Sequence, residues 1–285
     1  MWRMVVLMRI TRSEAEWNAG AFSSETLEKT SRCLRAEGAL ILEDIVNPAL
    51  IQEAREAFVQ RYDSYLDGQK HSDALQVGDR RLMITVDLEP PFERRELIAN
   101  PWLLSVLRAA FDDDVVLGAY GVVCSLPAAP SQRIHIDGSD LFPQAAINRV
   151  LPIVAVTVAI PLLEMNEIHG TTALWPRSHR DGEFASKVEA SLAPGSRNRA
   201  LGRTEIGDEP LVREGSCAIW DYRLLHSGTP NRSAVVRPLL YMTYCRAWFV
   251  DHKNYQQQAP VRAPKGFLAD LPEDLRRLLT RVQEC

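Results

Sequence analysis

The feature that most constrains the fold of this chain is a change in hydrophobic periodicity near residue 115. Before this point the apolar residues recur mainly at helical spacing. After it they fall into short runs broken by Pro, Gly and Asn, at 115–124, 132–137, 153–160, 171–175, 216–220 and 235–249. Several short strands separated by such breakers are typical of an antiparallel sandwich or barrel. The sequence therefore predicts a mainly β fold with flanking helices.

The N-terminal third predicts two helices with a short strand between them. A helix is expected at 25–37, ended by Gly38, followed by a strand over the apolar run 39–42. Asn47 can cap a second helix, for which Pro48 suits the first position. Its apolar residues recur at helical spacing and should face the core, namely Leu50, Ile51, Ala54, Ala57, Phe58 and Tyr62.

A single domain spanning 1–285 is expected, with a helical part at about 20–110 and a β core at about 115–250. A chain of 285 residues with 46% hydrophobic residues can bury one large core. Two long polar insertions, 138–149 and 178–209, interrupt the β region. Insertions of this length without periodicity predict lids or binding loops.

Charge and hydropathy exclude several classes of partner. The net charge is −4, and Lys and Arg are interspersed with Asp and Glu, so a nucleic-acid partner is not expected. The longest apolar stretch, 151–163, is shorter than a membrane span and contains Pro152 and Pro161. The start of the chain lacks the long apolar region of a signal peptide, so a cytoplasmic location is expected. Five cysteines form no CxxC pair and predict mostly buried, reduced thiols. The oligomeric state stays open.

His135 and Asp137 are the first candidates for a metal site. They stand two residues apart in a stretch that alternates with Ile134 and Ile136, so both side chains should leave the same face of a strand. Two other His-x-Asp pairs occur, at 71/73 and 179/181. Both have polar neighbours and are predicted to be solvated loop or helix-end residues.

His226 is the candidate for a third ligand. It follows a predicted strand and a tight turn, in Trp220-Asp-Tyr-Arg-Leu-Leu-His226-Ser-Gly. Two histidines and one carboxylate form a facial triad, which leaves three positions on octahedral iron(II) for a bidentate oxoacid and dioxygen. Zinc would accept the same residues, and His226 could instead be a core histidine satisfied by hydrogen bonds.

Arg237 follows His226 by eleven residues and has apolar neighbours. A planar guanidinium on the next strand could bind the distal carboxylate of an oxoacid through two parallel hydrogen bonds. The alternative is an ordinary surface or ion-paired arginine.

Three motifs together resemble the phytanoyl-CoA dioxygenase family of iron(II)/2-oxoglutarate enzymes. They are Gln-x-x-His-x-Asp from residue 132, Gly-Thr-Thr-x-x-x-Pro-x-Ser-His-Arg from 170, and His-x-Gly-x-x-Asn-x-Ser-x-x-x-Arg from 226. Their order and spacing are similar to the family's over roughly residues 35–250. The resemblance implies a double-stranded β-helix, or jelly roll, with helices packed outside. It also implies Fe(II) as the metal, 2-oxoglutarate as the cosubstrate and dioxygen as the oxidant.

The resemblance assigns roles to particular residues. It implies three iron ligands and one residue for the far carboxylate of 2-oxoglutarate, namely His135, Asp137, His226 and Arg237. Gln132 and Thr172 resemble positions that contact 2-oxoglutarate in some members. Arg80 or Arg81 is a candidate for a further charge near the cosubstrate, with a solvated arginine as the alternative. One departure is Arg177, where relatives commonly carry Gly before Ser-His, so the turn there is expected to differ.

The expected function is a dioxygenase that oxidises an apolar small-molecule, natural-product or lipid-like substrate. Because Asp137 is retained, hydroxylation is favoured over halogenation, whereas desaturation, epoxidation and rearrangement stay open. Candidates for lining the substrate site are Leu141, Phe142, Trp175 and Trp248. Two alternatives remain: a jelly-roll metal-binding or sensor protein without activity, and a facial-triad oxygenase that does not use 2-oxoglutarate.

Overall fold

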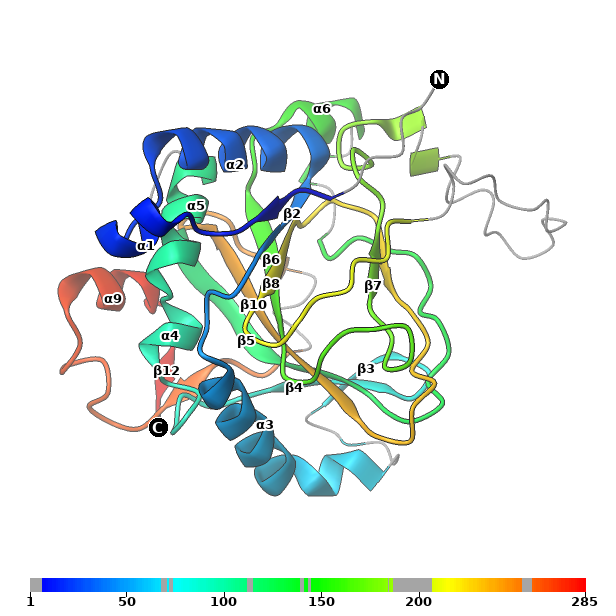
Figure 1. Cartoon of the computed structure of the whole chain (residues 1–285). Helices are drawn as coiled ribbons and strands as arrows, with labels where there is room; N and C mark the ends of the chain where they lie inside the picture. Colours follow the sequence, from blue (N-terminus) through cyan, green and yellow to red (C-terminus); the bar gives the residue numbers. More distant parts are fainter. Residues whose placement is uncertain are drawn as a thin grey trace, which may run out of the picture.

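The computed structural model describes residues 7–67, 71, 74–111, 115–138, 141–142, 145–183, 185–186, 207–252 and 258–285. Within these residues the largest element is an eight-stranded sheet with the order β1-β2-β8-β6-β10-β5-β4-β3 (Figure 1). Its strands are β1 (Arg9–Ile10), β2 (Ala39–Leu42), β3 (Leu75–Gly78), β4 (Arg81–Thr85), β5 (Val115–Ser125), β6 (Ala155–Pro161), β8 (Cys217–Asp221) and β10 (Arg237–Arg246). All neighbours pair antiparallel except β1 and β2.

A smaller sheet faces this one. It is formed by β7 (Thr172–Leu174) and β9 (His226–Gly228), which pair antiparallel. Two isolated β-bridges extend it: His135 pairs with His226, and Asp208 pairs with Leu174. Leu174 packs in one buried cluster with Trp220 and Leu239 of the large sheet. Two facing sheets with helices outside form the predicted mainly β jelly roll.

The strand expected at 132–137 is not formed and is replaced by a single bridge between His135 and His226. Pairing with β9 ends at His135, because the amides of Asp137 and Gly138 donate instead to the carbonyl of Tyr222, at 3.1 and 3.4 Å. The predicted alternation toward one face therefore holds only as far as His135, and Asp137 reaches the same site from a bend.

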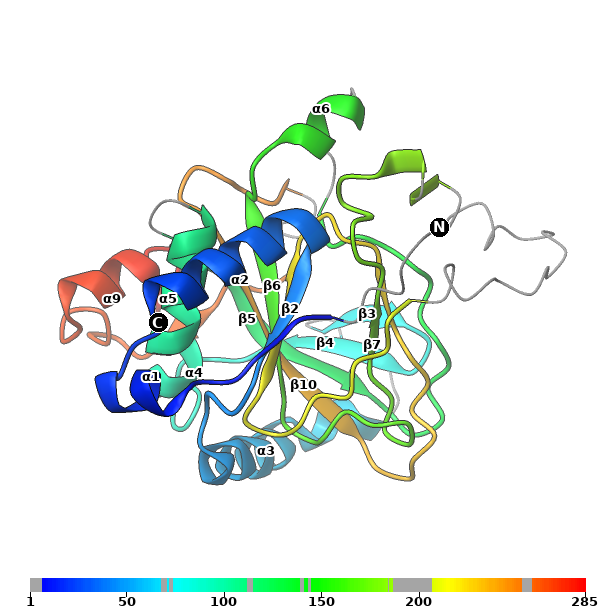
Figure 2. The same cartoon turned by 45° about the horizontal axis from the view of Figure 1, so that its top comes forward.

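Helices cover the outer face of the large sheet. Figures 1 and 2 show α5 (Pro101–Phe111) and α9 (Glu273–Leu278) on the side of the sheet away from β7. Leu103 and Leu107 share one buried cluster with Leu240 and Met242 of β10. The remaining helices are α1 (Glu14–Ala19), α2 (Ser24–Glu37), α3 (Pro48–Tyr62), η1 (Asp63–Asp67), α4 (Arg95–Ile98) and α6 (Ala145–Val150), and a further strand pair is β11 (Arg262–Ala263) with β12 (Gln283–Glu284).

The predicted N-terminal elements are confirmed in detail. Helix α2 ends where Gly38 adopts φ 82°, a left-handed conformation that favours glycine. Asn47 accepts a hydrogen bond from the amide of Ala49 at 2.9 Å, with Pro48 at the first helical position. Of the expected core residues of α3, Leu50, Ile51, Ala54 and Phe58 are buried.

The β3–β4 hairpin lies inside the segment predicted as helical. Its inward-facing residues include Arg81 and Thr85, while Leu82 and Ile84 pack toward the helices. Polar residues on an inward face weaken the apolar signal from which strands are predicted. The reason for this polarity is the site described below.

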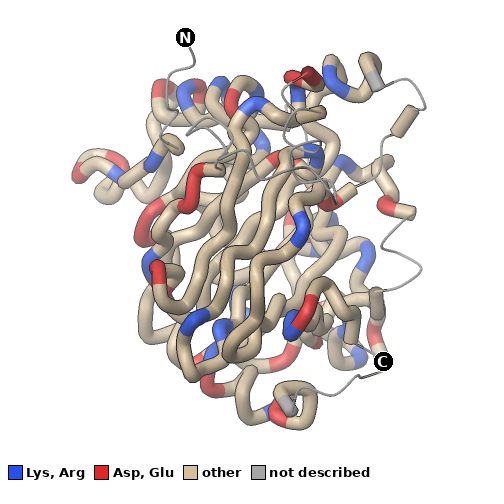
Figure 3. The backbone as a smooth tube through the Cα atoms, turned by 90° about the vertical axis from the view of Figure 1, so that its right-hand side faces the viewer, with Lys and Arg blue, Asp and Glu red and all other residues tan. Residues whose placement is uncertain are grey.

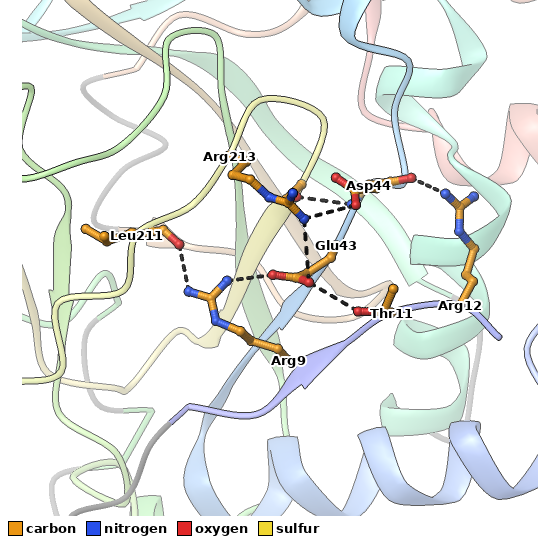
Figure 4. Close-up of polar contacts among 8 residues, drawn as sticks. Arg9, Thr11, Arg12, Glu43, Asp44, Leu211 and Arg213 are labelled. Carbon is orange, nitrogen blue, oxygen red and sulfur yellow. Dashed lines mark hydrogen bonds and ion pairs between the residues drawn. The ribbon is translucent and has the colours of Figure 1, made fainter.

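The N-terminal segment is fastened to the sheet edge by exposed polar contacts (Figure 4). Glu43 accepts from Arg9 at 2.7 Å and from Thr11 at 3.1 Å, and Asp44 accepts from Arg213 at 3.1 Å. Arg12 donates to the carbonyl of Asp44. Exposed ion pairs contribute little individually, so the network mainly fixes the register of β1 on β2.

Charged residues are dispersed along the backbone. Figure 3 shows Lys and Arg interspersed with Asp and Glu, without a stripe of one sign. Among the described residues, no helix is both long and apolar enough to cross a bilayer. Four of the five cysteines are buried free thiols, and Cys285 is exposed.

Candidate active site

The structure brings His135, Asp137 and His226 together. One potential ligand atom from each residue lies within 4.8 Å of the others. Nε2 of His226 is 3.3 Å from Oδ1 of Asp137, and the two imidazole ring centres are 4.2 Å apart. The three side chains thus form the two-histidine, one-carboxylate set that suits a mononuclear iron(II) site with open positions.

Backbone carbonyls fix the orientation of both imidazoles. Nδ1 of His135 donates to the carbonyl of Arg133 at 2.8 Å, and Nδ1 of His226 donates to that of Leu224 at 3.0 Å. With the proton on Nδ1, a neutral imidazole presents its Nε2 lone pair to a metal. The backbone around each histidine therefore selects the tautomer that a metal site requires.

Asp137 is oriented by two donors that sequence reasoning missed. Its Oδ2 accepts from the Thr157 hydroxyl at 2.6 Å and from Nε1 of Trp220 at 3.1 Å. These bonds leave Oδ1 directed toward His226. A signal existed for Thr157, because it is the only hydroxyl in the apolar strand AVTVAIP.

Electrostatics favour the charged carboxylate. Burial alone would raise the pKa of Asp137, but the neighbouring His226 and His135 and the Thr157 hydroxyl lower it well below its usual range. For His226, burial lowers the pKa, and the nearby Asp137 more than offsets this, so the pKa is raised. A cation between these groups would take the place of the imidazolium charge.

The other His-x-Asp pairs lie outside this cluster. His179 was predicted to be solvated and this was wrong: it is buried, with Nε2 3.3 Å from the carbonyl of Arg35. Burial lowers its pKa, which disfavours the charged imidazolium. His71 contacts the ring of Tyr65, and its partner Asp73 lies outside the described residues.

Arg237 is a buried residue and not a surface arginine. It begins β10 directly opposite Ser125 of β5, and Ser125 in turn pairs with Arg81 of β4, so all three side chains share the inward face. Both arginine residues are only 1% exposed. Of the two candidates for a further charge, Arg81 is therefore the buried one, whereas Arg80 is exposed and donates to the carbonyl of Pro127.

The two guanidinium groups have few partners. Arg81 donates to the carbonyls of Thr229 and Pro130 at 2.6 and 2.8 Å, and Arg237 reaches that of Gly170 at 3.4 Å. Nε and Nη1 of Arg81 and Nε of Arg237 have no partner among the described residues. Burial lowers the pKa of Arg237 to about 9, with a further contribution from Arg81, and burial lowers that of Arg81 to about 10. Leaving such donors buried and unpaired costs free energy, and a bound anion would reduce this cost by accepting their hydrogen bonds.

Gln132 and Thr172 lie beside this pair. The Gln132 carboxamide donates to the carbonyl of Val77 at 2.6 Å and accepts from the amide of Gly228 at 2.9 Å. Thr172 is buried on β7 directly opposite Gly228. A side chain at Gly228 would meet Gln132 and Arg81 within 3.0 Å, so the glycine provides the space in which these groups gather.

The third motif builds the connection from His226 to Arg237. The buried Asn231 donates to the carbonyls of Ser125 and Val235, at 2.9 and 2.8 Å, and accepts from the hydroxyl of Ser233. These contacts fasten the loop to β5 at the residue that lies between the two arginines. The motif spacing is therefore a structural requirement for placing Arg237.

Of the four proposed substrate-lining residues, Trp175 is buried in a satellite cluster with Leu225, and Trp248 is 63% exposed. Leu141 and Phe142 are exposed, and their amides donate to the side chain of Asn148. Much of the 138–149 and 178–209 insertions lies outside the described residues.

The turn at Arg177 has a left-handed conformation of the kind that favours glycine. Arg177 adopts φ 72°. Its guanidinium makes two hydrogen bonds with Glu37, at 2.7 and 2.8 Å, and its amide donates to the carbonyl of the same residue. The contacts with Glu37 therefore stabilise a left-handed conformation at an arginine.

Comparison with known proteins places this site in a family. The family model for phytanoyl-CoA dioxygenase (PhyH) matches residues 34–239, which include the candidate metal ligands and the candidate residues for 2-oxoglutarate. The chain belongs to the phytanoyl-CoA dioxygenase family. It is accordingly an enzyme of the iron(II)/2-oxoglutarate-dependent dioxygenase class, in agreement with its His-Asp-His cluster.

Relatives within and around the family are distant in sequence. Dioxygenase trt7 of Aspergillus terreus (strain NIH 2624 / FGSC A1156) is 20% identical over 233 residues, covering 80% of this chain and 76% of the relative. The epimerase SnoN, solved with Fe3+, α-ketoglutarate and nogalamycin RO, superposes with a TM-score of 0.59 at 16% identity, covering 84% of this chain and 91% of SnoN. HygX of Streptomyces hygroscopicus, solved with nickel and 2-oxoglutarate, gives 0.57 at 17% identity, covering 81% and 90%. These two structures establish the similarity of fold.

Proposed function

We propose that this phytanoyl-CoA dioxygenase family member hydroxylates a small organic, natural-product-like substrate at an iron(II) held by His135, Asp137 and His226, with 2-oxoglutarate as cosubstrate. The observation that carries the proposal is the pair of buried arginines on the same inward face as the metal cluster. Arg81 and Arg237 retain unpartnered N–H groups in the described structure, and a dicarboxylate could satisfy them. A metal-binding protein without 2-oxoglutarate would have no use for this costly arrangement.

The residues present fit both groups. The cluster offers two imidazole nitrogens and one carboxylate oxygen, a donor set that suits iron(II). Nε of Arg237 and Nε and Nη1 of Arg81 are buried donors that fit the distal carboxylate of 2-oxoglutarate. When bound, iron(II) and 2-oxoglutarate supply the oxidising chemistry by coupling the reduction of dioxygen to decarboxylation of the oxoacid to succinate.

The protein's own residues position the reactants and exclude water. The carbonyls of Arg133 and Leu224 hold both imidazoles in the metal-binding tautomer, and Thr157 with Trp220 holds the carboxylate. Leu174 and Leu239 pack between the sheets with Trp220, which keeps this part of the interior dry. A dry site strengthens the attraction between the arginines and a dicarboxylate.

Hydroxylation is the reaction that we favour, because Asp137 occupies the position that halogenating relatives leave open. SnoN, by its description, is an α-ketoglutarate-dependent epimerase. That similarity is one of fold and does not define the reaction of this chain. The reaction has to be determined by identifying the product. A hydroxylated product gains one oxygen atom, whereas an epimerised product keeps the mass of the substrate.

The proposal is tested by measuring succinate released by purified protein with iron(II), 2-oxoglutarate and air, while candidate substrates are screened for stimulation. Omitting iron or 2-oxoglutarate should abolish the signal, and the product of a stimulating compound should carry one atom of labelled dioxygen. Oxygen uptake that does not depend on 2-oxoglutarate would favour the alternative of a facial-triad oxygenase that does not use 2-oxoglutarate. Absence of any turnover with bound iron would favour a metal-binding protein.

A further inference from the structure

A cavity of about 190 Å³ lies on the inward face of the large sheet, at the other end of β10 from Arg237. Among its lining residues are Thr243 on β10 and Ala119 on β5. Six residues of strand separate Thr243 from Arg237, or about 20 Å. The cavity is therefore separate from the space around the two arginines.

Two lining residues connect the cavity to the groups that position Asp137. Thr243 stands directly opposite Thr157, the residue whose hydroxyl donates to Asp137. Tyr222 also lines the cavity, and its carbonyl accepts from the amide of Asp137 at 3.1 Å. A molecule in the cavity would therefore lie close to the residues that position Asp137, at the end of β10 away from the arginines.

This cavity is built largely by residues beyond the family match. The family model ends at residue 239, whereas most of the lining comes from later positions, including Thr243, Phe249, Asp251, Gln258, Val261 and Arg281. Its chemistry therefore comes mostly from the C-terminal region, outside the part that the family model matches. That makes it a place where specificity can differ from that of the relatives.

The lining combines apolar walls with hydrogen-bonding groups of both kinds. Phe249 and Val261 are buried and apolar, and the rings of Tyr222 and Phe249 meet edge to face at 6.2 Å. Asp251 offers carboxylate oxygens, and the hydroxyl of Thr243 can donate and accept. Nε2 of Gln258 donates to the Tyr241 hydroxyl, and the carboxamide oxygen of Gln258 is an acceptor. Apolar walls with a few placed polar groups are typical of small-molecule sites.

The part of the lining that the structure describes has one acidic and one basic residue, Asp251 and Arg281. Arg281 is already braced by the backbone, donating to the carbonyls of Phe249 at 2.6 Å and Ala247 at 3.1 Å. Asp251 is held by the Tyr222 hydroxyl, which donates to Oδ2 at 2.6 Å, and a carboxylate can accept further hydrogen bonds.

We infer that this cavity is the substrate subsite, and that it receives a neutral, hydroxyl-bearing ring whose hydroxyl groups hydrogen-bond with Asp251 and Gln258. The inference rests on the proposed function, since it gives the oxidised molecule a polar, ring-shaped end beside the metal. A cavity of about 150 Å³ accommodates benzene in another protein, so the volume suits one six-membered ring. Apolar parts of the substrate would extend away from the cavity.

Tyr222 and Asp251 provide matched variants. Tyr222→Phe removes the hydroxyl that orients Asp251 and keeps the backbone carbonyl that accepts from Asp137. Asp251→Ala removes the acceptor itself. Asp270→Asn, which changes an exposed carboxylate away from the cavity lining, is the control.

The test uses the full chain loaded with iron(II) and 2-oxoglutarate without oxygen, and two probes, trans-1,2-cyclohexanediol and tetrahydropyran. Proton relaxation of each probe is compared between the iron-loaded and the diamagnetic zinc-loaded protein. The diol should relax faster with iron and bind at least threefold more weakly in both variants, while tetrahydropyran shows little effect. The Asp270→Asn protein should behave as wild type.

Equal iron-dependent relaxation of the two probes, or diol affinity unchanged in both variants, would overturn the inference. Binding of 2-oxoglutarate is measured separately by calorimetry on the same proteins and should not change in either variant. If wild-type protein bound the diol but not 2-oxoglutarate, the cavity would be supported as a ligand site and the proposed function contradicted.

Discussion

Arg81 and Arg237 lie on either side of Ser125, each directly opposite it in the large sheet, and both guanidinium groups are buried without a carboxylate partner among the described residues. Burying two like charges next to each other destabilises the folded state unless an anion binds between them. In the proposed function, the distal carboxylate of 2-oxoglutarate is that anion.

We first predict the effect of Arg81→Met. Truncating one side of a buried charge contact costs about 2 to 5 kcal/mol, so 2-oxoglutarate should bind tens-fold to thousands-fold more weakly. Without ligand, the variant should be as stable as wild type or more so, because one unpaired charge has been removed. Thermal unfolding with and without 2-oxoglutarate measures both effects. A ligand-induced rise in Tm equal to that of wild type would place Arg81 outside the site.

The second prediction concerns the groups that orient Asp137. Thr157→Val and Trp220→Phe each remove one donor to Oδ2 while keeping most of the side-chain shape. Loss of such partners typically weakens metal affinity by about 10-fold to 100-fold. Iron affinity is measured by competition with a chelator. Thr85→Val removes a hydroxyl that donates to the carbonyl of Ala259 and serves as control; an equal loss there would show a general effect of strand threonines.

A third prediction separates the metal cluster from the other buried histidine. His135→Ala, Asp137→Ala and His226→Ala should each abolish most activity and iron binding while the fold persists. His179→Asn should lower stability, because it replaces a buried ring, but leave the iron content at one per chain. Metal analysis alongside thermal unfolding distinguishes the two patterns. Full turnover in any of the first three variants would refute the ligand assignment.

The fourth prediction isolates backbone strain at Arg177. Arg177→Ala loses the two hydrogen bonds with Glu37 and keeps a side chain at φ 72°, whereas Arg177→Gly loses the same bonds and relieves the strain. A left-handed conformation costs a non-glycine residue about 1 kcal/mol, so the glycine variant should be the more stable of the two by about that amount. The difference is measured by chemical denaturation. An alanine variant at least as stable as the glycine variant would contradict the strain argument.

The local sequence predicted those parts of the fold that depend on caps and periodicity. Gly38 and Asn47 set helix boundaries through their own backbone and side-chain chemistry, and the apolar runs identified most strands of the core. The β3–β4 hairpin was missed because Arg81 points inward, against the usual pattern of strand burial. His179 was misjudged because its burial depends on α2 and Gly38, which are distant in sequence.

In the site, motif spacing identified the residues that lie a short, fixed number of positions apart in the sequence. His135 and Asp137 are near neighbours, and His226 is tied to Arg237 by a loop that Asn231 fastens to β5. Trp220 and Thr157 reach Asp137 from other strands, and the cavity beside Tyr222 is assembled from segments up to residue 283. Such partners are brought together only by the packing of the sheets, so no local pattern indicates them.

The central claim is tested most directly by titrating 2-oxoglutarate against wild type, Arg237→Gln and Arg237→Lys. Apparent affinity in Arg237→Gln should fall tens-fold to thousands-fold, from a loss of about 2 to 5 kcal/mol, with unchanged iron content. Arg237→Lys should recover only part of the loss, because an ammonium group lacks the two-pronged geometry of a guanidinium. Unchanged dependence on 2-oxoglutarate in Arg237→Gln would contradict the proposed cosubstrate site.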